Sequence, residues 1–177
     1  MKTDLTQEQV RAIFDYDDEN GWLIRKKDEF GRVVNRPCGH KPSRSHGYGV
    51  VGIDGRRYLT HRIIWLLVHG TWPDEELDHI DQNKMNNRIE NLRPATRAEN
   101  CQNQGLRRNN SLGYSGVSWN KATKKFKAYI MVDNKEIYLG LFDIVEEAFL
   151  AYQLAKIKYH STSPIAQQYL RELTYAA

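Results

Sequence analysis

The residues best suited to joint chemistry lie between positions 78 and 100. Asp78 and His79 are neighbours, eleven residues separate His79 from Asn91, and eight separate Asn91 from Asn100. This spacing places one base and two oxygen ligands within reach of one divalent cation. Carboxylate and amide oxygens suit Mg²⁺ or Mn²⁺, which also accept phosphate oxygens. Because a histidine titrates near neutral pH and can take a proton from water, the pattern favours metal-assisted hydrolysis of a phosphate ester.

Two short strands and a polar loop are expected to hold the first of these residues. An apolar strand ends at Asp78 and His79, and residues 81–88 form a polar loop. Residues 89–93 are expected to return as a second strand. The segment therefore predicts a hairpin that carries the base.

A short helix is expected to bring Asn100 to the same point. Thr96 is a suitable helix N-cap, and Glu99 three residues later completes a capping box. Gly105 stands where the residue after a helix C-terminus would fall. Asn100 then lies in the first turn of a helix packed behind the hairpin.

This strand, strand and helix arrangement resembles the HNH endonucleases, in particular the phage and intron-homing branch in which asparagine replaces the last histidine. Members of that family cut a phosphodiester with one divalent ion in a ββα-metal unit. By position, the resemblance implies Asp78 and Asn100 as metal ligands and His79 as the general base. It implies Asn91 as the residue whose hydrogen bonds hold the loop and the histidine in place.

The segment before this unit carries a further resemblance to phage HNH proteins. His61 and Arg62 precede an apolar helix that Thr60 is expected to cap and that ends at Gly70. Arg62 is a candidate phosphate contact, with a structural role as the alternative. His69 is interpreted as a helix-end histidine.

Two other metal sites fit the sequence less well. Residues 81–92 have Asn86 and Leu92 where a calcium loop has glycine and glutamate. A zinc site of two cysteines and two histidines is the second alternative, but these residues lack the paired spacing typical of zinc ligands. Its four members would be Cys38, His40, His46 and Cys101.

Composition limits the protein class. At 177 residues the chain suits one ordinary domain or two small ones. It contains no apolar run long enough to span a membrane, and its first residues lack the apolar region of a secretory signal. Two cysteines do not make a disulfide framework. We expect a cytoplasmic protein, located in the bacterial host if a phage encodes it.

Charge is distributed unevenly along the chain. The net charge is +4, but residues 25–62 hold ten Lys or Arg against three acidic residues, and residues 101–132 hold six and no acid. Residues 63–100 hold four against seven acidic residues. Two basic blocks around an acidic, metal-capable centre suit double-stranded DNA as the partner, although such blocks are often only solvated surface.

The N-terminal part is predicted to form a small antiparallel β platform after one helix. A capping-box pattern at residues 6–9 begins that helix, and it ends in the acidic residues 15–19. Asp54–Gly55 predicts a hairpin. Residues 31–46 are interpreted as a basic loop.

The pattern changes after a polar linker that contains Arg107 and Arg108. Strands are expected at 114–119, 126–132 and 136–141, and Asp143 is expected to cap a following helix. This segment resembles the plant ethylene-response-factor (Apetala-type) DNA-binding domain, which phage HNH nucleases also carry. The matching segments are SGV at 115–117, FKAYI at 126–130, YLGLF at 138–142 and EEA at 146–148.

The resemblance implies that one sheet face enters the major groove of DNA. Ser118 and Met131 stand where the plant domains have arginines, which leaves the sequence preference open. Strand alternation places Lys125, Lys127 and Tyr129 on one face and their neighbours against the helix. The alternative is that these aromatics form core and the lysines only add solubility. All the candidate DNA contacts are Arg62, Arg93, Arg107, Arg108, Trp119, Lys121, Lys125, Lys127, Tyr129 and Tyr138.

The sequence as a whole predicts an α+β protein. The expected parts are a basic helix and β platform at 1–60, the ββα-metal HNH unit at 61–105, a linker at 106–112, a three-stranded antiparallel sheet packed on one helix at 113–160, and a C-terminal extension without evident function at 161–177.

The expected function is that of a metal-dependent HNH endonuclease of the phage or homing type. It would hydrolyse a phosphodiester of double-stranded DNA with one Mg²⁺ or Mn²⁺ ion and nick as a monomer. A non-cleaving, sequence-preferring DNA-binding regulator and an RNA-acting module are the alternatives. A decayed site should have lost Asp78, His79 or Asn100, and the sequence keeps all three.

Overall fold

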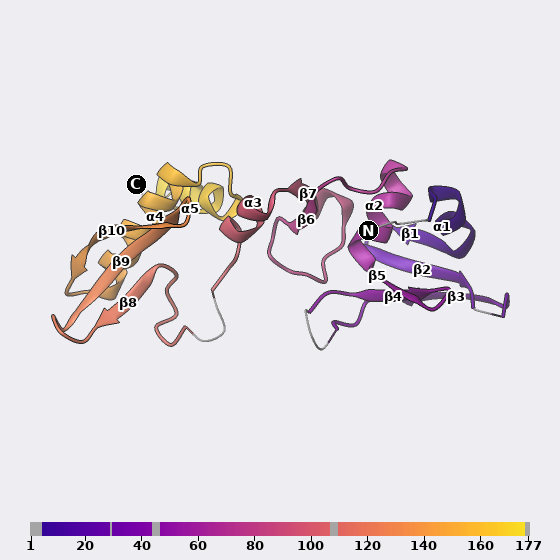
Figure 1. The fold of residues 1–177 in the computed structure, drawn as a ribbon, viewed down its shortest axis with the longest axis horizontal. Coiled ribbons are helices and arrows are strands. Elements are labelled where there is room, and N and C mark those ends of the chain that lie inside the picture. The colour runs from indigo at the N-terminus through magenta and orange to yellow at the C-terminus, as the bar shows by residue number, and fades with distance from the viewer. Residues whose placement is uncertain (1–4, 29, 44–46, 107–109, 176–177) are drawn as a thin grey trace. The chain divides into compact units, whose positions relative to one another are not determined.

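Small antiparallel sheets of two or three strands organise the chain (Figure 1). The computed structural model describes residues 5–28, 30–43, 47–106 and 110–175. The chain divides into two compact units, Met1–Asn100 and Cys101–Ala177. This division falls ahead of the linker expected at 106–112, and Arg107 and Arg108 lie outside the described residues.

The first unit begins with a capped helix and two small sheets. Thr6 and Gln9 form the predicted capping box of α1. Helix α1 (Gln7–Ile13) is followed by β1 (Phe14–Asp17), β2 (Trp22–Lys27) and β3 (Val33–Cys38), and these three strands lie in that order in one sheet. Strands β4 (Val50–Ile53) and β5 (Arg56–Leu59) form a separate hairpin.

Two predictions for this region were wrong. The acidic segment after α1 is a strand, because Phe14 is fully buried and residues 14–17 pair with β2. The interpretation of 31–46 as a loop missed β3, whose backbone pairs with β2 although its residues VVNRPC do not alternate between apolar and polar. His46 lies outside the described residues.

Helix α2 (Thr60–His69) forms the core of the first unit and ends at Gly70, as predicted. Its buried residues pack with Val10, Phe14 and Leu23. The expected capping role of Thr60 was wrong, since Leu59 is the N-cap. The Thr60 hydroxyl donates instead to the Gly39 carbonyl at 3.1 Å.

The hairpin and helix that carry the candidate site follow α2. The elements are β6 (Glu76–His79), the 3₁₀ turn η1 (Ile89–Asn91), β7 (Leu92–Ala95) and α3 (Arg97–Gln102). Strands β6 and β7 pair antiparallel, with Asp78 opposite Arg93. The returning strand therefore begins later than expected, because residues 89–91 form a tight turn. Helix α3 ends before Gly105, so Gly105 is not its C-terminal glycine.

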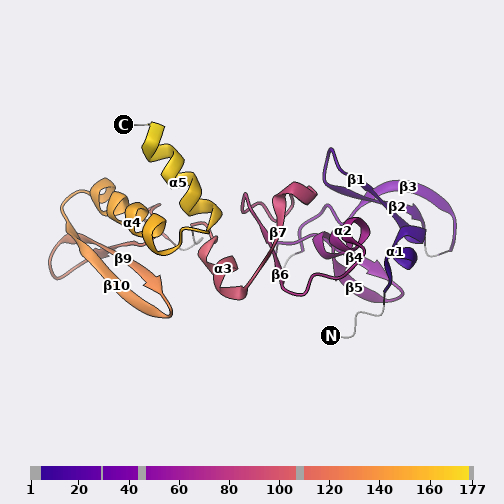
Figure 2. The same ribbon diagram turned by 90° about the horizontal axis from the view of Figure 1, so that it is seen from above.

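The second unit contains a three-stranded antiparallel sheet covered by a helix, as predicted. The elements are β8 (Val117–Asn120), β9 (Lys125–Val132), β10 (Lys135–Phe142), α4 (Val145–Tyr159) and α5 (Pro164–Tyr175), with sheet order β10-β9-β8. Figure 2 shows α4 along the sheet. Ala128 and Ile130 of β9 face this helix and are buried.

Close packing between sheet and helix depends on Gly116. Its φ is +69°, and a Cβ there would lie 2.0 Å from Cδ2 of Tyr152. Only glycine combines that backbone conformation with that approach. Tyr152 is itself a buried residue of α4.

Two predictions for the second unit were wrong. Asp143 does not cap α4, because it forms an ion pair with Lys125 at 2.9 Å and Ile144 is the N-cap. The segment 161–177 is more than a bare extension, because Ile165 and Tyr169 of α5 are buried in a core with residues of β9 and α4.

The start of the second unit is held by a buried lysine. Lys156 donates from Nζ to the Gln102 carbonyl at 2.6 Å, and the Ser163 hydroxyl donates to the same oxygen at 3.3 Å. Burial lowers the pKa of Lys156 to about 8. Across the described ranges, no helix combines the length and apolar character needed to cross a membrane.

Candidate active site

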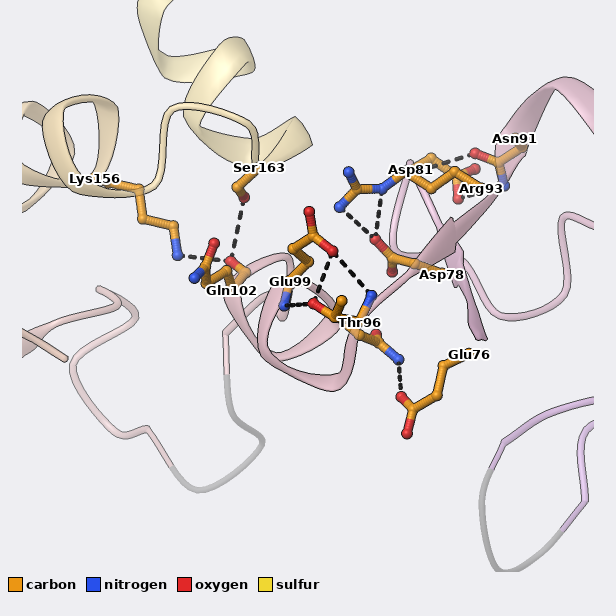
Figure 3. A network of polar contacts seen from close by, with 11 residues as sticks. Glu76, Asp78, Asp81, Asn91, Arg93, Thr96, Glu99, Gln102, Lys156 and Ser163 are labelled. Carbon is orange, nitrogen blue, oxygen red and sulfur yellow. Dashed lines mark hydrogen bonds and ion pairs between the residues drawn. The ribbon is translucent and has the colours of Figure 1, made fainter. Parts of the chain in front are cut away.

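Strand β6 presents two carboxylates on one face. Glu76 and Asp78 are two residues apart, so they point to the same side of the strand. Asp78 is 5% exposed, and its Oδ2 accepts hydrogen bonds from Nε and Nη2 of Arg93 at 3.0 and 2.9 Å (Figure 3). Arg93, expected to contact DNA, therefore holds the expected metal ligand in this structure.

The start of α3 brings Asn100 to the same face. The predicted capping box is confirmed, since the Thr96 N–H donates to Oε2 of Glu99 at 2.9 Å and the Glu99 N–H to Oγ1 of Thr96 at 3.3 Å (Figure 3). Asn100 then donates from Nδ2 to Oε2 of Glu76 at 2.8 Å. The sequence reasoning missed Glu76, although its alternation with Asp78 along the strand was a usable signal.

His79 points to the opposite face of β6 and is 3% exposed. Its Nε2 lies 3.0 Å from Oδ1 of Asn87. The amide group of Asn87 is oriented by a bond from its Nδ2 to the Met85 carbonyl. Because the facing Asn87 atom is an acceptor, Nε2 carries the proton and Nδ1 is the basic nitrogen.

Asn91 fixes the polar loop. Its Oδ1 accepts from the Asp81 N–H at 3.0 Å, and its Nδ2 donates to Oδ1 of Asp81 at 2.9 Å and to the Asn86 carbonyl at 2.7 Å. Burial raises the pKa of Asp81, but the hydrogen bonds from Asn86 and Asn91 leave it below its usual value. These bonds match the loop-holding role expected of Asn91, while Asn87 contacts the imidazole.

Two aromatic rings surround the His79 imidazole. His61 of α2 lies edge-on to it, with ring centroids 5.2 Å apart, and Tyr48 lies 5.1 Å from His61 and 5.8 Å from His79. Burial lowers the pKa of His61 to about 3 and also lowers that of His79. Both imidazoles are therefore neutral near pH 7.

Arg62 donates hydrogen bonds to the protein's own backbone. Its Nη1 and Nη2 donate to the carbonyls of Glu75 and Pro73, both at 3.3 Å, and its guanidinium lies over the Trp72 ring. These bonds hold the chain just before β6. They suit the structural alternative, and a phosphate contact from Arg62 stays a prediction.

The second unit separates the predicted DNA contacts between two sheet faces. Lys125, Lys127 and Tyr129 share one face, and Tyr138 joins them because it pairs with Tyr129. Trp119 pairs with Phe126 and so lies on the face that α4 covers, although it is 46% exposed.

The lysines of this face have acidic neighbours. Lys125 pairs with Asp143, and Lys127 pairs with Glu136 and lies over the Tyr129 ring. Lys121 is exposed in the turn between β8 and β9. Acidic partners reduce the charge that this face offers to a phosphate backbone.

The donor set beside α3 fits a hard divalent cation. Asp78 and Glu76 supply carboxylate oxygens. The Asn100 amide supplies its carbonyl oxygen, because its nitrogen donates to Glu76. Oxygen-only sets suit Mg²⁺ and Mn²⁺. Within the described part of the chain, no three His, Cys, Asp or Glu side chains are grouped so that they could hold a metal, and His46 of the zinc alternative lies outside that part.

Known proteins match the segment that contains this site. Residues 58–102 match the family model described as HNH endonuclease. Protein 3.8 of Escherichia phage T7 is 29% identical over 94 residues, which cover 52% of this chain and 78% of that protein. No solved structure matches the chain. At residues 58–102 the chain therefore contains an HNH endonuclease domain.

Proposed function

We propose that this protein is a divalent-metal-dependent endonuclease that nicks double-stranded DNA, of the phage type. The observation that carries the proposal is the buried contact of 3.0 Å between Nε2 of His79 and Oδ1 of Asn87, which orients a neutral imidazole at the end of β6. The oxygen donors of Asp78 and Asn100, with Glu76 beside them, lie at the same strand. His79 lies on one face of β6 and the oxygen donors on the other, at the end of the same strand, and phosphodiester hydrolysis uses both a base and an oxygen-bound metal.

His79 accepts a proton from the attacking water through Nδ1. The water oxygen bonds to phosphorus, and the bond from phosphorus to the 3′ oxygen breaks. The departing 3′ oxygen takes a proton from solvent, which leaves a 5′-phosphate and a 3′-hydroxyl. Asp78 and Asn100 would hold the divalent ion, which supplies charge stabilisation for the phosphate and the departing oxygen. Asn91 keeps the loop beside this centre in one conformation.

The second unit supplies DNA binding in this proposal. Its sheet face with Lys125, Lys127 and Tyr129 is the candidate contact surface, by resemblance to the Apetala-type domain. One copy of the chain carries one site, so nicking as a monomer in the bacterial host cytoplasm is the proposed activity. The similarity to a phage protein supports this setting.

Cleavage of supercoiled plasmid tests the proposal. Wild-type protein with Mg²⁺ or Mn²⁺ should give open circles, and EDTA or the change His79→Ala should abolish them while DNA binding persists. His69→Ala is the matched control, because it removes an exposed histidine from α2. Cleavage retained by His79→Ala would refute the base assignment. Salt-sensitive binding without cleavage by wild type would favour the regulator instead.

A further inference from the structure

Tyr48 enters the candidate site from outside the family match. It precedes β4, ten residues before the matched segment at 58–102 begins. Its ring contacts both imidazoles, at 5.1 Å from His61 and 5.8 Å from His79. The β platform therefore contributes a side chain to the site in addition to the ββα elements.

The other side of this contact is a lysine of the polar loop. The Lys84 ammonium lies 4.5 Å from the centroid of the Tyr48 ring. The Lys84 stem also passes the preceding backbone, since a Cβ on Gly47 would lie 3.7 Å from its Cδ. An ammonium over an aromatic face is attracted by the ring quadrupole, which restrains a flexible chain. Tyr48 thus restrains Lys84 on the same side as His79.

Positive charge at this place favours binding of a DNA phosphate. Asp81 of the loop is negative, Glu76 and Asp78 on the other face of β6 add two charges of which Arg93 offsets one, and each phosphodiester carries another. One divalent ion offsets only part of that repulsion. A restrained ammonium beside the base supplies further positive charge where the substrate phosphate must lie.

We propose that Tyr48 is a positioning residue that holds the Lys84 ammonium beside His79, where Lys84 binds a phosphate of the cleaved strand. This inference rests on the proposed nuclease function. Lys84 acts on the substrate directly, whereas Tyr48 acts through Lys84. The hydroxyl of Tyr48 is not required for either contact.

The test combines salt-dependent binding with cleavage by the full-length protein. Binding of a labelled DNA duplex is measured between about 50 and 200 mM salt without divalent ions, and plasmid nicking is measured at saturating protein. Lys84→Met should lower the slope of log affinity against log salt by about 0.9, the loss of one phosphate contact. It should also slow nicking by about tenfold.

Variants at Tyr48 separate positioning from simple packing. Tyr48→Phe keeps the ring and should nick like wild type, whereas Tyr48→Leu should slow nicking by about fivefold. The double change with Lys84→Met should be no slower than Lys84→Met alone, because both remove one interaction. Lys158→Met is the matched control, since Lys158 is an exposed lysine that also lies over a tyrosine ring, that of Tyr159.

The outcomes separate this inference from the proposed function. If wild type nicks DNA but Lys84→Met changes neither rate nor salt slope, the inference is overturned and the nuclease stands. If wild type never nicks, the nuclease proposal fails, and the salt slope alone still decides whether Lys84 contacts phosphate. If Tyr48→Leu does not fold, Lys84→Met decides, because Lys84 is exposed. Additive effects of the two changes would refute the positioning role.

Discussion

Acid should destabilise the first unit through His61. Burial, with smaller effects of His79 and Arg62, lowers the pKa of this histidine from 6.5 to about 3. The unfolded chain therefore binds a proton that the folded one excludes, so stability is full above pH 6.5 and falls as the pH drops toward 3. At pH 4.5, two pH units below 6.5, protonation favours the unfolded chain about a hundredfold, on the order of 2–3 kcal/mol.

Urea unfolding at pH 7 and pH 4.5, without divalent ions, measures this effect. A Trp119→Phe background leaves Trp22, Trp65 and Trp72, all in the first unit, as fluorescent reporters. The further change His61→Phe keeps an aromatic ring but removes the titrating group. Its loss of unfolding free energy between the two pH values should be about 2–3 kcal/mol smaller than that of the parent.

The control for that experiment is His69→Phe, which removes an exposed histidine from the same helix. It should follow the parent at both pH values, so that the effect is specific to the buried position. Equal pH dependence of the parent and the His61→Phe variant would refute the reasoning. It would mean that His61 takes up a proton in the folded unit without lowering the unfolding free energy.

Two further predictions concern residues that orient others. Asn87→Leu should lower kcat for nicking at least tenfold with little change in KM, because the imidazole of His79 loses the acceptor at its Nε2, and an unchanged kcat would contradict this. Gly116→Ala should destabilise the second unit by about 3 kcal/mol, because its Cβ would overlap Tyr152 at a positive φ. Urea unfolding followed by Trp119 fluorescence, with Trp22, Trp65 and Trp72 replaced by phenylalanine, measures that loss, and an unchanged midpoint would show that Tyr152 moves aside freely.

Features that depend on neighbouring residues were predictable from the sequence. The capping box of Thr96 and Glu99 and the alternation along β9 follow from local spacing, and the structure has both. The spacing of Asp78 and Asn100 likewise indicated that strand and helix ends would meet. Asn100 does face β6, although its amide contacts Glu76.

Features that depend on distant partners were not predictable in this way. The polar loop contains several asparagines, and only its folded turn determines that Asn87 faces His79 while Asn86 contacts Asp81. Thr60 had the residue type of a cap, but Gly39, far away in sequence, accepts from its hydroxyl. Trp119 was expected among the DNA contacts, but it lies on the face that α4 covers, because the register of β8 against β9 is set by pairing between strands.

The boundary inside α3 marks a place where genes of this kind can exchange their parts. Asn100 closes the first unit and Cys101 opens the second, so a proposed metal ligand and the start of the other unit are consecutive codons. Lys156 and Ser163 of the second unit both donate to the main-chain carbonyl of residue 102. Because every residue type supplies that carbonyl, a recombinant needs only to continue α3 as a helix through this position, and the side chain at position 102 can change without loss of either hydrogen bond.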